Sequence, residues 1–338
     1  MEVIYPRCAG LDVHQKTVVG CVRLASKRKV VQEVRTFGTT TSELLALSDW
    51  LASHRCTHVA MESTGIYWRP VWHVLEGTFE LVLANAMHIK NIPGRKSDVN
   101  DATWISNLLA HGLIRGSFVP PTVIQELRDL TRSRKQLVRE AAQHIQRIQK
   151  VLEDANVKLT EILSDVMGKS GRAIIEALIA GEQDPEVLAS LACGNRLKAT
   201  HEEFVEALRG RVTPHHRFLL KLHLGQIDTL ESAVRELEVR VGDALLPFRE
   251  SAELLTTIPG VNDTVARVII AEIGLDMGRF PTSGHLISWA GLCPGMNESA
   301  GKRLSGRIRA GAPWLKATLV QAAWPAIPGS TVVGERTR

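Results

Sequence analysis

The chain has 338 residues, of which 44% are hydrophobic and 23% charged, and a formal net charge of +5. At about 100–200 residues per domain, this length predicts two or three domains, and the composition excludes wholesale disorder. No stretch has the ~18 consecutive apolar residues of a membrane span, and the N-terminus lacks the apolar core of a signal peptide. The five cysteines form no CxxC pair, so neither a zinc site nor a disulfide framework is expected. We therefore expect a reducing, cytoplasmic setting.

Residues 1–120 have the pattern of an α/β domain. Short apolar runs joined by tight connections predict an antiparallel three-stranded meander, followed by further strands and helices. The expected strands cover 7–13, 17–23, 29–37, 56–62 and 79–85, and the expected helices cover 42–54, 66–77 and about 99–111. A polar loop, IPGRKSDVND, precedes the last of these helices.

A helical spacer, residues 121–250, is expected after the Pro120-Pro121 pair. Apolar residues at helical spacing predict one long helix from Thr122 to about Ser164. A second helix, from about His216 to Leu245, has apolar residues alternating at three and four positions, which is the heptad pattern. Together these helices predict an antiparallel helical hairpin or coiled coil that could serve as an oligomer contact.

The third expected domain, residues 251–338, begins with a possible nucleic-acid module. LLTTIPGVNDTVARVIIAEIG has the form of a helix-hairpin-helix, in which two apolar helices flank a Pro-Gly turn. The turn at Gly260 would offer backbone N–H groups to a DNA phosphate. A plain αα-hairpin without a nucleic-acid role would have the same pattern.

Four acidic residues stand at the ends of the expected elements in the first domain. Asp12 closes the first strand, Glu62 closes the fourth, and Asp98 and Asp101 lie three apart at a helix N-terminus. Functional groups gather at the carboxyl ends of strands, so the four carboxylates would meet if the first and fourth strands are neighbours. Such a cluster needs divalent cations to neutralise it, as in two-metal phosphodiester cleavage. Singly, Asp98 could be a helix cap and Glu62 a turn residue.

The segment from Pro294 to Arg338 contains seven basic residues and two acidic ones, a local excess equal to the charge of the whole chain. This excess indicates a polyanionic partner, although a solvated polar loop is the plainer alternative. Ser299 is followed by small residues and then by Lys302, which predicts an accessible hydroxyl in a flexible basic loop, suited to attack on a phosphodiester. Ser305 has a similar context, and either serine could be an ordinary loop residue.

Two blocks of sequence carry a family resemblance. GLDVHQKTVVG, MESTGIYW and NIPGRKSDVNDATWISNLLAHGLIRGSFVPP resemble the N-terminal half of the DEDD transposases of bacterial insertion sequences. The stretch from IPGVNDTVARVIIAEIG through WAGLCPGMNESAGKRLSGRIRAG to QAAW resembles their C-terminal transposase domain. The resemblance implies an RNase H-like, RuvC-type N-terminal domain, a coiled-coil spacer and a small helical C-terminal domain.

The same resemblance implies a chemistry. Asp12, Glu62, Asp98 and Asp101 would be the metal-binding tetrad for two Mg²⁺ or Mn²⁺ ions, and Ser299 would be the nucleophile that joins to a DNA strand end. The implied partners are element-end and target DNA, a structured guide RNA from the element, and further copies of the chain that complete a composite site, in the bacterial cytoplasm and on the nucleoid. Phosphate contacts are expected from Lys96, Gly260, Lys302, Arg303, Arg307 and Arg309.

The C-terminal end departs from the family pattern. Family members usually continue past QAAW in further helices, whereas this chain has Pro325, Pro328 and the polar run GSTVVGERTR, so we expect the third domain to end early. Three rival functions stay open at this point. They are a RuvC-like nuclease that cuts branched DNA with an activated water, a non-catalytic DNA-binding remnant, and a sugar-kinase or actin-like ATPase, which would require glycine-rich phosphate loops that this sequence lacks.

Overall fold

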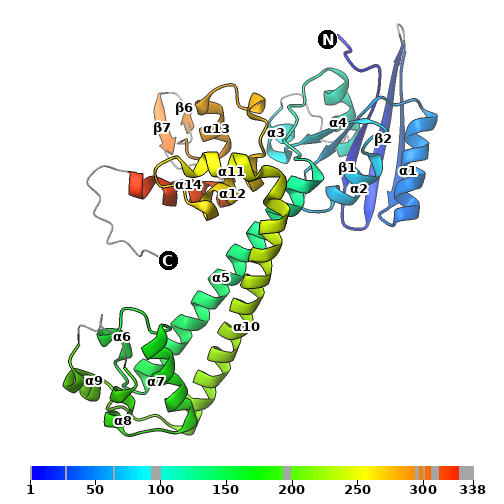
Figure 1. Ribbon diagram of the computed structural model, residues 1–338. Helices are drawn as coiled ribbons and strands as arrows, with labels where there is room; N and C mark the ends of the chain where they lie inside the picture. The colour runs from blue at the N-terminus through cyan, green and yellow to red at the C-terminus, as the bar shows by residue number, and fades with distance from the viewer. Residues whose placement is uncertain are drawn as a thin grey trace. The chain divides into compact units, whose positions relative to one another are not determined.

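The computed structural model describes residues 2–26, 29–63, 65–92, 100–192, 199–293, 297–299, 301–305 and 312–326. The chain divides into two compact units, Met1–Val119 and Pro120–Arg338, each of which is described by itself (Figure 1). A further division of the second unit near residue 250 stays a prediction.

A five-stranded sheet in the order β3-β2-β1-β4-β5 is the framework of the first unit. Its strands are β1 (Arg7–Val13), β2 (Thr17–Ser26), β3 (Lys29–Gly38), β4 (His58–Glu62) and β5 (Glu80–Ala84). The first three form the predicted antiparallel meander, and β1, β4 and β5 run parallel to one another. The expected α/β class is therefore confirmed, and the topology is compatible with an RNase H-like domain.

Helices cover both faces of this sheet (Figure 1). Helices α1 (Thr41–Ser53) and α2 (Trp68–Leu75) pack on one face through a core that includes Leu11, Leu47 and Met61. The other face carries α3 (Ala86–Asn91), a short helix that the sequence pattern did not predict, and α4 (Asp101–Ala110). The core on this second side includes Cys8, Ala60, Ile89, Ile105 and Leu109.

Gly10 sets the position of α4 against the sheet. A Cβ atom on Gly10 would lie 2.3 Å from the Ala102 carbonyl oxygen and 2.4 Å from the Ser106 amide nitrogen, so only glycine allows this approach. Two residues earlier on β1, the Cys8 thiol instead donates to the Ser106 carbonyl oxygen at 3.6 Å. Gly10 therefore contacts an earlier part of α4 than Cys8 does, so the two elements run in opposite directions. This places the N-terminus of α4 at the carboxyl end of β1.

Two long helices, α5 (Thr122–Asp154) and α10 (Pro214–Leu245), pack along each other in opposite directions in the second unit (Figure 1). This is the helical hairpin that the sequence predicts, while coiled-coil packing in the strict sense stays a prediction. The start of α10 follows from its sequence, because Thr213 caps the helix by accepting from the His216 amide at 3.4 Å and Pro214 occupies the first turn.

The expected continuous helix to about Ser164 is wrong, because α5 ends at Asp154. Asn156 adopts a positive φ of 55°, which turns the chain out of the helix before the short α6 (Leu159–Ile162). Leu159 is buried in the same core as Leu152. The apolar spacing that favoured one helix therefore comes from two segments that pack on each other.

The described residues between 155 and 212 form what we call the distal lobe, at one end of the helix pair (Figure 1). Besides α6 it contains α7 (Lys169–Ala180), α8 (Pro185–Ser190) and α9 (His201–Ala207). Its core also includes Ile148 and Leu152 of α5 and Leu220 and Ile227 of α10. Where the chain enters and leaves the lobe, the Arg211 amide donates to the Ala155 carbonyl oxygen at 2.8 Å.

The other end of the helix pair packs against the C-terminal helices. Ile124 and Leu127 of α5 share a core with Val241 and Leu245 of α10 and with Ile270. The elements here are η1 (Leu246–Phe248), α11 (Arg249–Thr256), α12 (Asp263–Ile273), η2 (Met277–Arg279), α13 (Ser283–Trp289), β6 (Asn297–Ser299), β7 (Lys302–Ser305) and α14 (Pro313–Ala326). Across the described parts of the chain, every helix is too short or too polar to cross a membrane.

Candidate functional site

The first and fourth strands are direct neighbours, as the acidic cluster requires. Strands β1 and β4 pair in parallel with Leu11 opposite Met61, so Asp12 and Glu62 occupy the next position of the same register. Side chains alternate along a strand, which places both carboxylates on the face that carries Gly10 and α4. Asp12 is the penultimate residue of β1, and Glu62 is the last residue of β4.

Asp101 belongs to the same end of the sheet. It is the first residue of α4, whose N-terminus lies at the carboxyl end of β1 on the face that Asp12 and Glu62 share. The cap of this helix is Asn100, whose side-chain oxygen accepts from the Ala102 amide at 2.8 Å. Asp98, the candidate cap and fourth acid, lies outside the described residues, as does Lys96.

The surroundings of these acids are polar and half-buried. The Asp12 carboxylate is 18% exposed and lies 3.1 Å from Nε2 of His14. Among the described residues, no group of three or more carboxylate, histidine or cysteine side chains is close enough together to hold a metal ion. The donor chemistry is nevertheless that of hard cations, because carboxylate oxygens are what Mg²⁺ and Mn²⁺ prefer in proteins.

Ser299 lies in a β-hairpin, so the expected flexible loop is wrong for this segment. It is the last residue of β6 and pairs with Lys302 at the start of β7, while Ser305 pairs with Asn297. Gly301, between the strands, has a positive φ of 73°, which favours a tight connection. Strands of three and four residues with Leu304 as their one apolar residue have no apolar alternation, so the sequence pattern could not predict them.

The basic residues around Ser299 are only partly described. Lys302 is exposed at the start of β7, and Arg303 is its neighbour on the strand. Arg307 and Arg309 lie outside the described residues. The contribution of this group to phosphate binding stays a prediction.

The candidate phosphate-binding turn lies between α11 and α12. Gly260 has a positive φ of 85°, a conformation that explains the glycine. Asn262 caps α12 by accepting from the Val265 amide at 3.0 Å. Two helices joined by a short turn are what the helix-hairpin-helix pattern predicts, but the plain αα-hairpin remains equally compatible.

A buried ion pair in the second unit was missed by the sequence reasoning. Glu272, on α12, is 1% exposed and accepts two hydrogen bonds from the Arg132 guanidinium of α5. A single acid inside the apolar run VIIAEIG was the available signal, because a carboxylate is rarely buried without a partner.

Cys8 and Cys56, both buried, are poor candidates for nucleophilic chemistry. Burial raises the pKa of the Cys8 thiol to about 12 and that of Cys56 to about 11. A thiol with so high a pKa is protonated at neutral pH and is a poor nucleophile.

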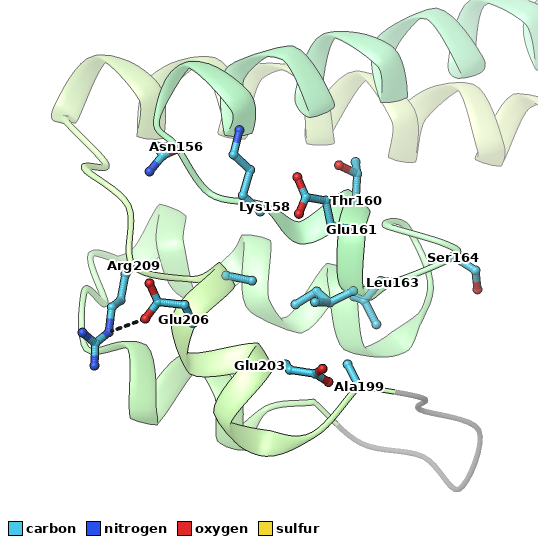
Figure 2. Close-up of a pocket in the computed structure, with 12 residues that line it drawn as sticks. Asn156, Lys158, Thr160, Glu161, Leu163, Ser164, Ala199, Glu203, Glu206 and Arg209 are labelled. Atoms are coloured by element: carbon cyan, nitrogen blue, oxygen red, sulfur yellow. Dashed lines mark ion pairs between the residues drawn. The ribbon is translucent and has the colours of Figure 1, made fainter.

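A cavity of about 920 Å³ lies in the distal lobe (Figure 2). Its lining comes from α6, α9 and the residues that flank them, and it carries both signs of charge, with Lys158 and Glu161 on one side and the Arg209–Glu206 ion pair on the other. None of the predicted site residues lines it. The lining offers no single ligand chemistry, so the sheet edge and the β6–β7 hairpin remain the candidate site.

The chain matches known families at both of these places. Residues 9–157, which include all four predicted acids, match a model for the DEDD-type transposase of IS110. Residues 252–332, which include Ser299, match the model described as "Transposase IS116/IS110/IS902 family". The "Insertion element IS110 uncharacterized 43.6 kDa protein" of Streptomyces coelicolor is 39% identical over 72 residues, which are 21% of this chain and 17% of that protein. With the two models matched in order along its length, the chain belongs to the IS110-type family of DEDD transposases.

Proposed function

We propose that this protein is a DNA transposase that cuts and rejoins the ends of an insertion element. The observation that carries the proposal is the position of Asp12, Glu62 and Asp101 at one end and on one face of the sheet, in a chain of the IS110-type family. An acidic sheet edge and a separate serine-bearing hairpin fit a reaction that needs both carboxylates to hold metal ions and a hydroxyl to attack the DNA.

Asp12, Glu62, Asp98 and Asp101 would hold two Mg²⁺ or Mn²⁺ ions at the sheet edge. Asp12 and Glu62 each follow the paired residues Leu11 and Met61 on neighbouring strands. Asp101 lies at the start of α4, the helix that packs closely on Gly10. Bound there, the ions would acidify the attacking hydroxyl and stabilise the oxygen that leaves.

Ser299 would supply the attacking oxygen. Its Oγ forms a bond to the phosphorus of the scissile phosphodiester, the bond from phosphorus to the 3′-oxygen breaks, and the serine proton ends on that 3′-oxygen. The product is a phosphoserine link to one strand end and a free 3′-hydroxyl on the other. Attack of a 3′-hydroxyl from the second DNA on the phosphoserine reverses these changes and rejoins the strands.

Basic groups around the hairpin would hold the DNA backbone. The proposed phosphate contacts are Lys96, Gly260, Lys302, Arg303, Arg307 and Arg309, and their affinity would fall as the salt concentration rises. The exposed position of Lys302 supports a role for it in this group.

Further partners complete the proposal. The chain would act in the bacterial cytoplasm on nucleoid DNA, guided by a structured RNA from the element. It would work as a dimer or tetramer assembled through the helix pair, where Val138 of α5 and Val239 of α10 are 43% and 69% exposed. The acids of one subunit would then face the serine of another.

Covalent trapping tests the proposal directly. The full chain, with RNA transcribed from the element's non-coding ends, is incubated with Mg²⁺ and a fluorescent duplex spanning an element junction. We expect a protein–DNA adduct that survives denaturing electrophoresis. Ser299→Ala should abolish the adduct and leave DNA binding intact, and Ser305→Ala is the matched control.

Other outcomes point to the rival functions. Adduct formation by Ser299→Ala but not by Ser305→Ala would reassign the nucleophile to Ser305. Metal-dependent cleavage of branched DNA without any adduct would favour a RuvC-like nuclease. Binding without cleavage under every condition would favour a non-catalytic DNA-binding protein.

A further inference from the structure

Arg132 and Glu272 form a buried, bidentate ion pair between α5 and α12. The guanidinium Nε donates to one carboxylate oxygen and an Nη to the other, both at 2.8 Å. The Glu272 side chain is 1% exposed and that of Arg132 is 31% exposed. This planar fork fixes the direction of both side chains as well as their separation.

Arg128, one turn earlier on α5, binds the backbone of the same helix end. Its guanidinium donates to the carbonyl oxygens of Ala271 at 3.0 Å and Glu272 at 2.8 Å, close to the C-terminus of α12. An arginine here satisfies carbonyl groups that have no partner within the helix and complements the helix dipole. The end of α12 is therefore attached to α5 through backbone and side chain together.

Trp314, the second residue of α14, lies against the same group. The Arg132 guanidinium carbon is 5.6 Å from the centre of its ring, and the Lys135 ammonium nitrogen is 5.8 Å from it. Two cations at this distance from one indole are cation–π contacts. Burial lowers the pKa of Lys135, with a further lowering from Arg139 and an opposing effect of Glu272.

The opposite side of α12 packs against both flanks of the serine hairpin. Ala290, which follows α13, and Leu315, next to Trp314, share a core with Ile269 and Ile273 of α12. The chain between these two flanks contains β6, β7 and Ser299. One helix thus supports both ends of the serine-bearing segment, and the ion pair fixes that helix to α5.

We propose that Arg132, Glu272 and Trp314 form a clasp that positions the serine-bearing segment for reaction. They are positioning residues, which act through α12 and α14 on the placement of the segment that carries Ser299 and touch no substrate. The inference rests on the proposed function, since it assumes that Ser299 is the nucleophile. The inference gives the buried Glu272 carboxylate a role beyond stability. An apolar residue of similar size could pack in this core, but it would not bind Arg132 and so would not fix the position of α14.

Single-turnover trapping separates positioning from folding. Arg132→Lys keeps the charge but loses the fork, Trp314→Leu removes the ring, and Trp314→Phe restores an aromatic face. The adduct assay is run with excess protein, and its amplitude and rate constant are read separately. We expect Arg132→Lys and Trp314→Leu to lower the rate constant by about tenfold or more at nearly full amplitude, with Trp314→Phe recovering most of the loss.

A matched control lies on the same helix. Arg134 pairs with Glu238 across the helix pair, but Glu238 is 44% exposed, whereas Glu272 is 1% exposed. Arg134→Lys should therefore leave the rate constant unchanged. DNA binding, measured by fluorescence anisotropy on the same duplex, should be the same for all of these variants.

The outcomes distinguish the two proposals. If the wild-type chain forms no Ser299 adduct, the proposed function fails and this inference fails with it. If the wild type reacts but the clasp variants lose amplitude alone, the residues are merely structural and only this inference is overturned. Should Arg132→Lys fail to fold, the comparison of Trp314→Leu with Trp314→Phe gives the same answer.

Discussion

The two halves of the candidate site are built in different ways. The acids stand at the ends of β1 and β4, where strand register and the Gly10 contact fix their backbone from within one sheet. Ser299 stands on a hairpin that, in the part of the chain the structure describes, pairs β6 with β7 alone. A five-stranded sheet with a core on each face needs no outside support, whereas a hairpin of two short strands is marginal in isolation.

This difference shows where support must come from. The hairpin depends on α12 and on the clasp to α5, so residues distant from Ser299 in the sequence should control its reactivity. The acids depend on their own sheet, so substitutions that alter their chemistry should leave the fold intact. The predictions that follow separate these two kinds of dependence, beginning with the largest expected effect.

Asp12→Asn should lower strand cleavage by about 10³-fold, because it removes the charge that a divalent cation needs at the sheet edge. The isosteric amide should be tolerated at this partly exposed strand end, so the thermal midpoint should hardly change. Single-turnover cleavage in Mg²⁺ measures the first effect and calorimetry the second. Asp49→Asn, at an exposed position on α1, is the control, and equal losses in both variants would contradict the assignment.

Ile273→Ala should destabilise the support of the hairpin by about 2–5 kcal/mol, the usual range for removing a buried isoleucine side chain. Ile273 is 5% exposed in the core that holds both hairpin flanks. Hydrogen exchange should become faster in α12 to α14 and stay unchanged in β1 and β4. Faster exchange in the sheet as well would show that the two halves are not independent.

Gly10→Ala should cost about 1–3 kcal/mol in unfolding free energy, because the new methyl group would overlap the backbone of α4. Denaturant unfolding of the first unit measures the loss. Gly116→Ala is a matched control, since its Cβ would meet only a Val82 methyl at the ordinary distance of 3.6 Å. An equally large loss in both variants would remove the special role of Gly10.

The smallest effect concerns pH and the helix pair. Nδ1 of His223 lies 3.1 Å from Nδ1 of His144, and burial, together with His144 and Arg147, lowers the pKa of His223. The unfolded chain therefore binds the proton more readily, so stability should fall as the pH drops below the ordinary histidine value of about 6.5.

Urea unfolding at several pH values, followed by circular dichroism, tests this expectation. His223→Gln should flatten the dependence between pH 7.5 and 5, whereas His201→Gln, on the exposed surface of the distal lobe, should leave it unchanged. A wild-type stability that rises on acidification would contradict the sign.

The sheet could be predicted from the sequence because each strand carries its own local signal. The apolar runs that end at Asp12 and Glu62 were sufficient to place two acids at strand ends, and turn residues separate the first three strands. Their meeting at one edge required strand order, which depends on contacts distant in the sequence. The register that aligns Asp12 with Glu62 is therefore known only from the structure.

Two errors came from signals that were local but ambiguous. Beyond Asp154, Leu159 continues the helical spacing although the helix has ended and Asn156 has a positive φ. Periodicity does not distinguish one helix from two segments that pack on each other. Around Ser299 the residues are small and polar, so composition favoured a loop where backbone pairing makes a hairpin. Neither the packing of Leu159 nor the backbone pairing of β6 with β7 produces a recognisable pattern in the sequence.

The distal lobe has a consequence for how this molecule can be redesigned. The chain enters it at Ala155 and leaves it at Val212, and the backbone hydrogen bond from Arg211 to Ala155 holds its two ends side by side. In topological terms the lobe is an insertion into a helical hairpin. A short connection could replace it, or a foreign domain with close termini could be grafted in its place, with the register of α5 and α10 preserved.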